Sequence, residues 1–159
     1  MKKQLPDFMK FFSYDPKTGL FHWLVDRPNG VKAGDIAGCK HSDGGIVITL
    51  FSKQYKAGRL AWFFMFGEWA LIDHKDTVRD NNRADNLRKA TQQQNSQNRR
   101  RTGKFLKGVK CNALGRTFSA SITQNGKNKH LGNFKTETAA HDAYATAAKR
   151  LFGEFARLS

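Results

Sequence analysis

The chain has 159 residues, which is enough for one ordinary domain or two small ones. Its net charge of +15 makes nucleic acid the leading class of partner, with an anionic membrane surface as the rival. The sequence has no run of about 18 apolar residues, so we expect no membrane-spanning segment.

The first third of the sequence predicts a short helix followed by strands and turns. Apolar residues over 5–12 have the spacing of a short amphipathic helix. Residues 14–19 predict a turn, since proline and glycine stand at positions that suit its geometry. Strands are then expected over 20–25, 35–38 and 46–50.

A strongly apolar segment follows at residues 60–69. It predicts a helix that is apolar nearly all round and therefore buried. We expect this helix to support the polar segment that comes after it. Arg59 precedes the helix and is a candidate phosphate contact, although a surface arginine without a role explains it equally well.

The most informative stretch begins with Asp73 and His74 and continues through Asn86 to Asn95. It predicts a strand, a long loop, a second strand and a helix, folded so that Asp73, His74 and Asn95 meet. Carboxylate and amide oxygens are hard ligands that suit a magnesium-class cation. An imidazole beside such a cation can take a proton from water. These are the minimal parts for hydrolysing a phosphodiester.

Three motifs in order carry a family resemblance: Asp73-His74, then Asp80-Asn81-Asn82-Arg83-Ala84-Asp85-Asn86-Leu87-Arg88, then Gln94-Asn95 with Asn98. Together they resemble the HNH nucleases, specifically the homing-endonuclease branch in which asparagine is the third motif residue. A polar loop before a polar helix is the alternative interpretation. The ordered set of three motifs favours the nuclease.

The resemblance implies an N-terminal ββα-metal nuclease domain over residues 1–101, with extra strands before the motif. It implies that His74 is the general base and that Asn86 pins the loop between the two strands. Asp73 and Asn95 would hold Mg²⁺ or another divalent cation such as Mn²⁺. The implied products are a 5′ phosphate and a 3′ hydroxyl.

One position departs from that branch. The segment before the motif usually reads His-Arg-Leu-Ala-Trp, and here it begins with Gly58. The glycine removes neither the assigned base nor the assigned ligands, but we expect it to lower activity. It also supports an alternative function, a non-cleaving DNA-binding regulator that retains the nuclease fold. RNA binding, suggested by charge alone, is a third reading.

A basic segment after the motif marks a domain boundary and predicts a linker over residues 102–106. Its charged residues favour a phosphate-gripping role over that of a merely solvated segment. They are Arg99, Arg100, Arg101 and Lys104.

Residues 107–159 predict a second domain, a three-stranded antiparallel sheet packed on one helix. The strands are expected over 108–112, 116–123 and 129–134. Asn125-Gly126 is typical of a tight hairpin turn between the last two. Thr136 suits the N-cap of a helix over 137–152, whose small alanine residues would let it lie close to the sheet.

A second resemblance is carried by Gly108-Val109, Phe118, Ala120, Ile122, Asn125-Gly126, residues 130–134, Ala139-Ala140, Ala143-Tyr144 and residues 151–156. These resemble the APETALA2/ethylene-response-factor DNA-binding domain, which lays its sheet in the major groove. The resemblance implies DNA contacts from Lys110, Asn112, Ser119, Ser121, Thr123, Asn128 and His130, flanked by Arg116, Lys127 and Lys129. Several arginine and tryptophan positions of the plant pattern are polar here, so we expect groove binding without plant-like base specificity.

The combined expectation is an α+β protein that acts as a metal-dependent endonuclease of homing type on double-stranded DNA. A double-strand break would need a homodimer or two sequential nicks, because an HNH unit has one active site. The N-terminus lacks the apolar core of a signal peptide, and Cys39 and Cys111 form no Cys-x-x-Cys pair. We therefore expect a reducing cytoplasm, that of a host cell if the chain is phage-encoded, and no membrane partner.

Overall fold

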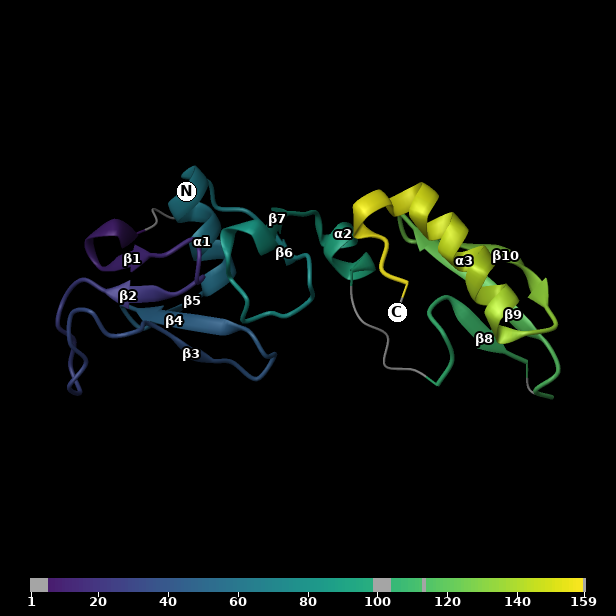
Figure 1. The fold of residues 1–159 in the computed structure, drawn as a ribbon, viewed down its shortest axis with the longest axis horizontal. Helices are drawn as coiled ribbons and strands as arrows, with labels where there is room; N and C mark the ends of the chain where they lie inside the picture. The colour runs from purple at the N-terminus through teal and green to yellow at the C-terminus, as the bar shows by residue number, and fades with distance from the viewer. Residues whose placement is uncertain (1–5, 99–103, 113, 159) are drawn as a thin grey trace. The chain divides into compact units, whose positions relative to one another are not determined.

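The computed structural model describes residues 6–98, 104–112 and 114–158. The chain divides into two compact units, residues 1–90 and 91–159, and each is described by itself (Figure 1). This division falls earlier in the chain than the domain boundary predicted at residue 101, and the predicted linker lies partly outside the described residues. No helix among the described residues is both long enough and apolar enough to cross a membrane.

The first unit consists of short strands, one α-helix and two 3-10 turns. Its elements are η1 (Phe8–Lys10), β1 (Phe12–Tyr14), β2 (Phe21–Trp23), β3 (Cys39–Lys40), β4 (Ile46–Leu50), β5 (Lys53–Lys56), α1 (Ala57–Phe66), β6 (Ile72–His74), η2 (Ala84–Asn86) and β7 (Leu87–Lys89). The strands pair antiparallel as β1-β2, β3-β4-β5 and β6-β7. The predicted strand over 20–25 is thus shorter, and the one over 35–38 is a single bridge between His22 and Ile36.

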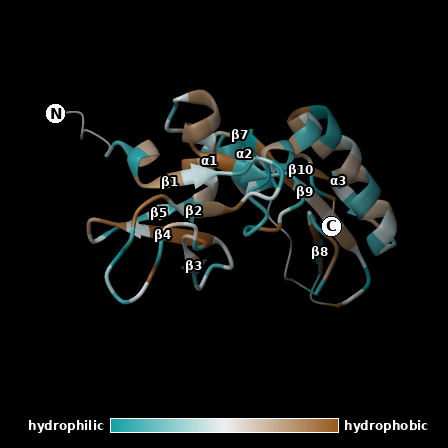
Figure 2. Ribbon diagram, turned by 60° about the vertical axis from the view of Figure 1, so that its left-hand side comes forward, coloured by the Kyte–Doolittle hydropathy of each residue, from teal (hydrophilic) through white to brown (hydrophobic). Residues whose placement is uncertain are grey.

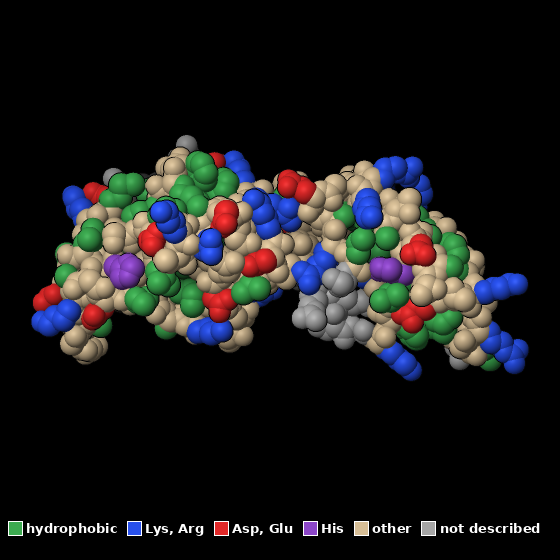
Figure 3. All heavy atoms as spheres, viewed as in Figure 1, with side chains coloured by type: hydrophobic (Ala, Val, Ile, Leu, Met, Phe, Trp, Pro, Cys, Tyr) green, Lys and Arg blue, Asp and Glu red, His purple; other side chains and the backbone are tan. Residues whose placement is uncertain are grey.

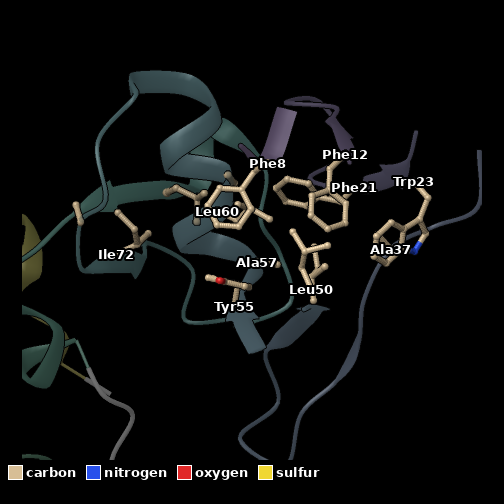
Figure 4. Close-up of a cluster of buried hydrophobic side chains, with 14 residues drawn as sticks. Phe8, Phe12, Phe21, Trp23, Ala37, Leu50, Tyr55, Ala57, Leu60 and Ile72 are labelled. Carbon is tan, nitrogen blue, oxygen red and sulfur yellow. The ribbon is translucent and has the colours of Figure 1, made fainter. Parts of the chain in front are cut away.

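Large aromatic rings form the core of the first unit (Figure 4). Phe8, Phe12 and Phe21 have almost no exposed surface. Phe8 meets Tyr55 edge to face, with the ring centroids 4.9 Å apart. Each buried aromatic ring removes a large apolar area from water, and edge-to-face pairs add a specific geometry. The helix predicted over 5–12 is replaced by two other elements among the described residues. Phe8 lies in the 3-10 helix η1, and Phe12 already belongs to strand β1.

Helix α1 begins and ends three residues earlier than predicted. Leu60 and Ala61 are fully buried, whereas Phe66 is 59% exposed, so the prediction of burial all round is wrong for the last turn. Gly67 ends the helix with a φ of 66°, and its N–H donates to the Phe63 carbonyl oxygen. Glycine adopts this left-handed conformation without steric cost, which explains why the helix stops before Trp69.

The second unit places three strands against one long helix. Its elements are α2 (Gln92–Gln97), β8 (Val109–Cys111), β9 (Phe118–Gln124), β10 (Lys127–Phe134), α3 (Glu137–Phe152) and η3 (Gly153–Phe155). The strand order is β10-β9-β8, antiparallel throughout. This confirms the predicted three-stranded sheet, and α3 has the predicted bounds. Asn125 and Gly126 both have positive φ, as a type I′ turn requires.

Small residues let α3 approach the sheet closely. Ala140 and Ala148 of α3 are fully buried, as are Val109 and Ala120 of the sheet. Hydrophilic and hydrophobic residues are interleaved along α3, as Figure 2 shows. The Thr136 hydroxyl accepts from the Ala139 N–H at 3.2 Å, so Thr136 is the N-cap, as predicted.

Helix α2 is bound within the second unit by side chains at its C-terminal end. The Lys107 ammonium donates to the Gln97 carbonyl oxygen at 2.6 Å. The Gln97 side chain donates to the Thr123 carbonyl oxygen at 3.3 Å. At the N-terminal end, Thr91 and Gln94 form a capping box. These contacts explain why α2 belongs to the second unit although it directly follows β7 in sequence.

Candidate functional site

The hairpin of β6 and β7 presents Asp73 and His74 next to each other on one strand. Its register pairs Asp73 with Arg88 and His74 with Leu87. Asp73 is 4% exposed, and its Oδ2 accepts from Arg88 Nε at 2.9 Å and Nη2 at 2.8 Å. Both nitrogens lie against the same oxygen, so the ion pair holds Oδ2 toward the guanidinium. Asp73 is therefore an oriented, charged group at the start of the loop.

The loop between β6 and β7 is cross-linked by Asn86. The Asn86 Oδ1 accepts from the Asp76 N–H at 3.1 Å, and its Nδ2 donates to Asp76 Oδ1 at 3.0 Å and to the Asn81 carbonyl oxygen at 2.7 Å. Asn86 is buried. One side chain thus connects the two ends of the loop, which is the geometry that its predicted pinning role requires.

Asp76 collects further hydrogen bonds in the same loop. The Asn81 side chain donates to Asp76 Oδ2 at 2.7 Å, and the Val78 N–H donates to Oδ1 at 2.8 Å. Burial alone would raise the pKa of Asp76, but the hydrogen bonds from Asn81, Val78 and Asn86 outweigh it and lower the pKa. Asp76 therefore stays ionised at neutral pH and holds the loop as an acceptor.

His74 contacts Asn82, a residue for which the sequence predicts no role of its own. His74 Nε2 lies 3.1 Å from Asn82 Oδ1, and Asn82 is 2% exposed. The signal in the sequence was weak, because Asn82 is one of two adjacent asparagines in a polar motif. Only the fold shows that Asn81 turns to Asp76 while Asn82 turns inward to the imidazole.

Gly58 packs against this same pair. It lies buried in the first turn of α1, and a Cβ added to it would be 3.1 Å from Asn82 Oδ1 and 3.3 Å from His74 Nε2. Those distances are tighter than ordinary van der Waals contact. The departure noted at this position is therefore part of the site, and the bare backbone leaves room for the imidazole and the amide.

Asn95, the third predicted member of the site, lies on α2 in the second unit. It is half-buried, and its N–H donates to the Thr91 carbonyl oxygen at 3.0 Å. Asp73 and His74 share one strand of the first unit. The meeting of all three side chains stays a prediction.

The side chains present fit a hard cation whose remaining ligands are water and the phosphate oxygens of the substrate. Among the described residues, no group of three or more His, Cys, Asp or Glu side chains is placed to hold a metal ion. Mg²⁺ typically takes one or two carboxylates and fills its other positions with water and phosphate oxygens. A carboxylate oxygen is a hard ligand of the kind that such a cation prefers, and Arg88 contacts Oδ2 of Asp73.

Six candidate DNA-binding residues of the second unit share one face of its sheet. The register pairs Lys110 with Ser119, His130 with Ser121, and Asn128 with Thr123. Ala120 and Ile122 alternate with these residues along β9 and are buried. The face opposite α3 is therefore the polar one. The register pairs Lys127 with Gln124 and Lys129 with Ile122, so these two exposed lysines belong to the other face, next to the hairpin turn.

Other candidate contacts have different settings. Asn112 lies beyond the end of β8, where its Oδ1 accepts from the Arg116 and Thr117 N–H groups, so it shapes a turn. Arg59 donates from Nε to the Ala70 carbonyl oxygen at 3.0 Å. Arg116 and Lys104 are exposed, whereas Arg99, Arg100 and Arg101 lie outside the described residues. Figure 3 shows Lys and Arg side chains standing out from both units.

Two comparisons with known proteins agree on the nuclease motif. Residues 55–97 match the family model described as HNH endonuclease, a segment that includes α1, β6, β7 and α2. An uncharacterized HNH endonuclease of Acanthamoeba polyphaga mimivirus is 41% identical over 85 residues, which cover 54% of this chain and 44% of the relative. The chain thus spans less than half the length of that relative. No solved structure matches.

Proposed function

We propose that the chain is a metal-dependent DNA endonuclease that hydrolyses phosphodiester bonds in duplex DNA. The observation that supports it most is the β6–β7 hairpin, where the oriented carboxylate of Asp73 adjoins an imidazole bonded to a buried amide. The match of this segment to the HNH endonuclease model supports the same reaction. A homing type and a role of residues 107–159 as an APETALA2-like DNA anchor belong to the proposal.

In the proposed reaction, His74 takes a proton from a water molecule as the oxygen attacks phosphorus in line. The bond to the 3′ oxygen breaks, which leaves a 5′ phosphate and a 3′ hydroxyl. Asp73 and Asn95 would hold the cation, and Arg88 would orient Asp73 through the hydrogen bond from Nε and the ion pair from Nη2. A bound divalent cation would supply positive charge that stabilises the phosphorane and the leaving oxygen.

The second unit supplies affinity in this proposal. Its polar sheet face and exposed lysines suit a negatively charged backbone, and phosphate contacts dominate DNA affinity. The β6–β7 hairpin with Asp73 and His74 lies in one compact unit, and the sheet face lies in the other. Changes at the hairpin should therefore alter the rate, and changes at the sheet should alter binding.

The deciding experiment replaces the proposed base. His74→Ala should slow Mg²⁺-dependent nicking of supercoiled plasmid by about 10²–10⁴-fold, since this is the usual contribution of a general base. Binding to duplex DNA should persist. His41→Ala is the matched control, because His41 lies in the first unit but bonds to Asp43 instead of the loop. Cleavage by His74→Ala at the wild-type rate would exclude His74 as the base.

The ligand assignment has its own test. Asp73→Ala and Asn95→Ala should each raise the Mg²⁺ concentration needed for half-maximal nicking, or abolish nicking altogether. Because Asp73 also pairs with Arg88, Arg88→Met is the control, since it breaks the ion pair but keeps the carboxylate. An unchanged Mg²⁺ titration in a ligand variant would remove that residue from the site.

The alternative function is a DNA-binding regulator that retains the nuclease fold without cutting. Gly58 favours it, since this position departs from the cleaving pattern and lies against His74. A protein that binds duplex DNA but never nicks it at any Mg²⁺ or Mn²⁺ concentration would establish the regulator. Stronger competition by structured RNA than by duplex DNA would contradict both functions.

A further inference from the structure

We infer that Asn82 is a positioning residue that holds the His74 imidazole with its hydrogen on Nε2, and that the N-terminal hairpin β1–β2 holds Asn82 in place. The catalytic meaning of this arrangement rests on the proposed function. The arrangement itself concerns side chains of the first unit only, so it can be measured without cleavage.

The orientation of the Asn82 amide follows from its two partners. Asn82 Nδ2 lies 3.3 Å from the Asp80 carbonyl oxygen, which can only accept a hydrogen bond. The amide nitrogen must therefore face Asp80, and Oδ1 must face the ring at 3.1 Å. An amide oxygen accepts, so His74 Nε2 must donate. A neutral imidazole has one N–H, which leaves the basic lone pair on Nδ1.

Burial favours this orientation of the Asn82 amide over the flipped one. Asn82 is 2% exposed, and the first turn of α1 closes over the contact at Gly58. Turning the amide over would bring its oxygen against the Asp80 carbonyl oxygen, which is also an acceptor. The buried amide oxygen would then have no donor there, a state that proteins avoid.

The N-terminal hairpin is hydrogen-bonded to the backbone on either side of Arg83, next to the Asn82 side chain. The Tyr14 hydroxyl donates to the Asn82 carbonyl oxygen at 2.8 Å, and the Ala84 N–H donates to the Pro16 carbonyl oxygen at 3.0 Å. Burial, with the charges of Asp15 and Asp85, raises the pKa of Tyr14 to about 12. The phenol therefore stays protonated and remains a donor across the neutral range.

Gly19 allows the closest contact between the hairpin and the backbone of residues 82–83. Its φ is +77°, and a Cβ at this position would lie 2.6 Å from both Asn82 C and Arg83 N. No side chain fits there, so the turn between β1 and β2 packs directly on the 82–83 peptide. The hairpin, which lies before the matched segment in sequence, thereby supports the imidazole through Asn82.

The consequence concerns which nitrogen serves as the base. A general base works only when its lone pair faces the water that it activates. With Nε2–H given to Asn82, Nδ1 is the nitrogen that takes the proton. Loss of the amide would free the ring to rotate, and small misplacements of a catalytic group can cost orders of magnitude in rate.

The test is nitrogen and proton NMR of metal-free protein labelled at histidine, at a pH where the ring is neutral. We expect the His74 hydrogen on Nε2, with slow solvent exchange. Asn82→Leu should make that proton exchange fast and lower kcat roughly 10–100-fold with little change in KM.

Two comparisons keep the outcome clear if Asn82→Leu fails to fold. Tyr14→Phe removes only the hydroxyl and should accelerate exchange of the Nε2 proton partially, whereas Asn81→Leu, whose amide bonds to Asp76, should not. A hydrogen on Nδ1 in the wild type, or unchanged exchange in both Tyr14→Phe and a folded Asn82→Leu, would overturn the inference. A protected Nε2 proton in a protein that never cleaves DNA would leave it standing while the proposed function fails.

Discussion

The two compact units bury different kinds of side chain. The first unit encloses large aromatic rings and, beside them, three buried polar residues of the motif, Asp73, Asn82 and Asn86. The second unit packs alanines of α3 on a short sheet and turns the polar side of that sheet outward. The first unit therefore holds its polar motif side chains in buried positions, whereas the second unit exposes its polar side chains on the surface of the sheet.

This difference matches what the two proposed tasks demand. General-base chemistry needs one imidazole held to within a fraction of an ångström, which a network of buried hydrogen bonds can provide. Polyanion binding needs several charges that add up, and each can remain mobile at the surface. A single substitution in the buried hydrogen-bond network of the first unit should therefore lower the cleavage rate strongly. A single substitution on the surface of the second unit should lower DNA affinity only slightly.

The largest expected effect tests the rigidity of the first unit. Leu60 of α1 is fully buried in the aromatic cluster, so Leu60→Ala should destabilise the first unit by about 2–5 kcal/mol through the cavity that it leaves. A milder change in the second unit is Ile122→Val, which removes a single carbon and should therefore cost only about 0.5–1.5 kcal/mol. Urea unfolding followed by tryptophan fluorescence measures the first, since all three tryptophans lie in this unit.

A single unfolding transition shifted equally by both substitutions would break the comparison, because it would mean that the two units unfold as one. Two transitions, with Leu60→Ala moving only the fluorescence-detected one, would sharpen it.

A smaller effect is expected at the hairpin end of the second unit's sheet, where Lys127 and Lys129 are exposed. Replacing Lys127 and Lys129 together by alanine should reduce the slope of log affinity against log salt by about 1.8, if each neutralises one phosphate. The factor by which affinity falls between 50 and 200 mM salt should then be roughly tenfold smaller than in the wild type. The measurement is fluorescence anisotropy on one duplex, with Lys10 and Lys17 of the first unit replaced as control. An equal change in slope for both pairs would mean that the sheet is not the anchor.

The smallest expected effect concerns the support of α2. Burial, together with Arg157, lowers the pKa of Lys107 to about 8, while the unfolded chain keeps the ordinary value near 10.5. Between these values the folded protein loses a proton that the unfolded chain retains, so the stability of the second unit should rise with pH. Lys107→Met should remove this rise. Thermal unfolding followed by circular dichroism between pH 7.5 and 10 measures it, and identical pH dependence in the two proteins would contradict it.

Elements with strong local signals were predictable from the sequence. The Asn125-Gly126 turn, the alternation along β9 and the N-cap at Thr136 each depend on residues close in the chain, and each lies where it was predicted. The strand, loop, strand and helix of the motif also appear in the predicted order.

Features that depend on distant contacts were not predictable. The strand β1 was missed because Phe12 is recruited by Trp23 and Phe21 across a hairpin, so its apolar spacing imitated a helix. Strand β5 was missed because its residues are mostly polar and only Tyr55 is buried. The same reason applies at the site, since Asn82 becomes special only when Tyr14, Gly58 and His74 close around it.

The bond from Tyr14 to the Asn82 carbonyl oxygen joins residues 68 positions apart, and this separation has a consequence for folding kinetics. Closing so long a stretch of chain loses more conformational entropy than closing a local turn. Such contacts therefore form late in folding. The loop that carries Asn82 should acquire its final geometry only after the aromatic core has assembled. During synthesis the first unit leaves the ribosome before the second. The imidazole support can therefore be complete while the lysine-bearing sheet is still being made.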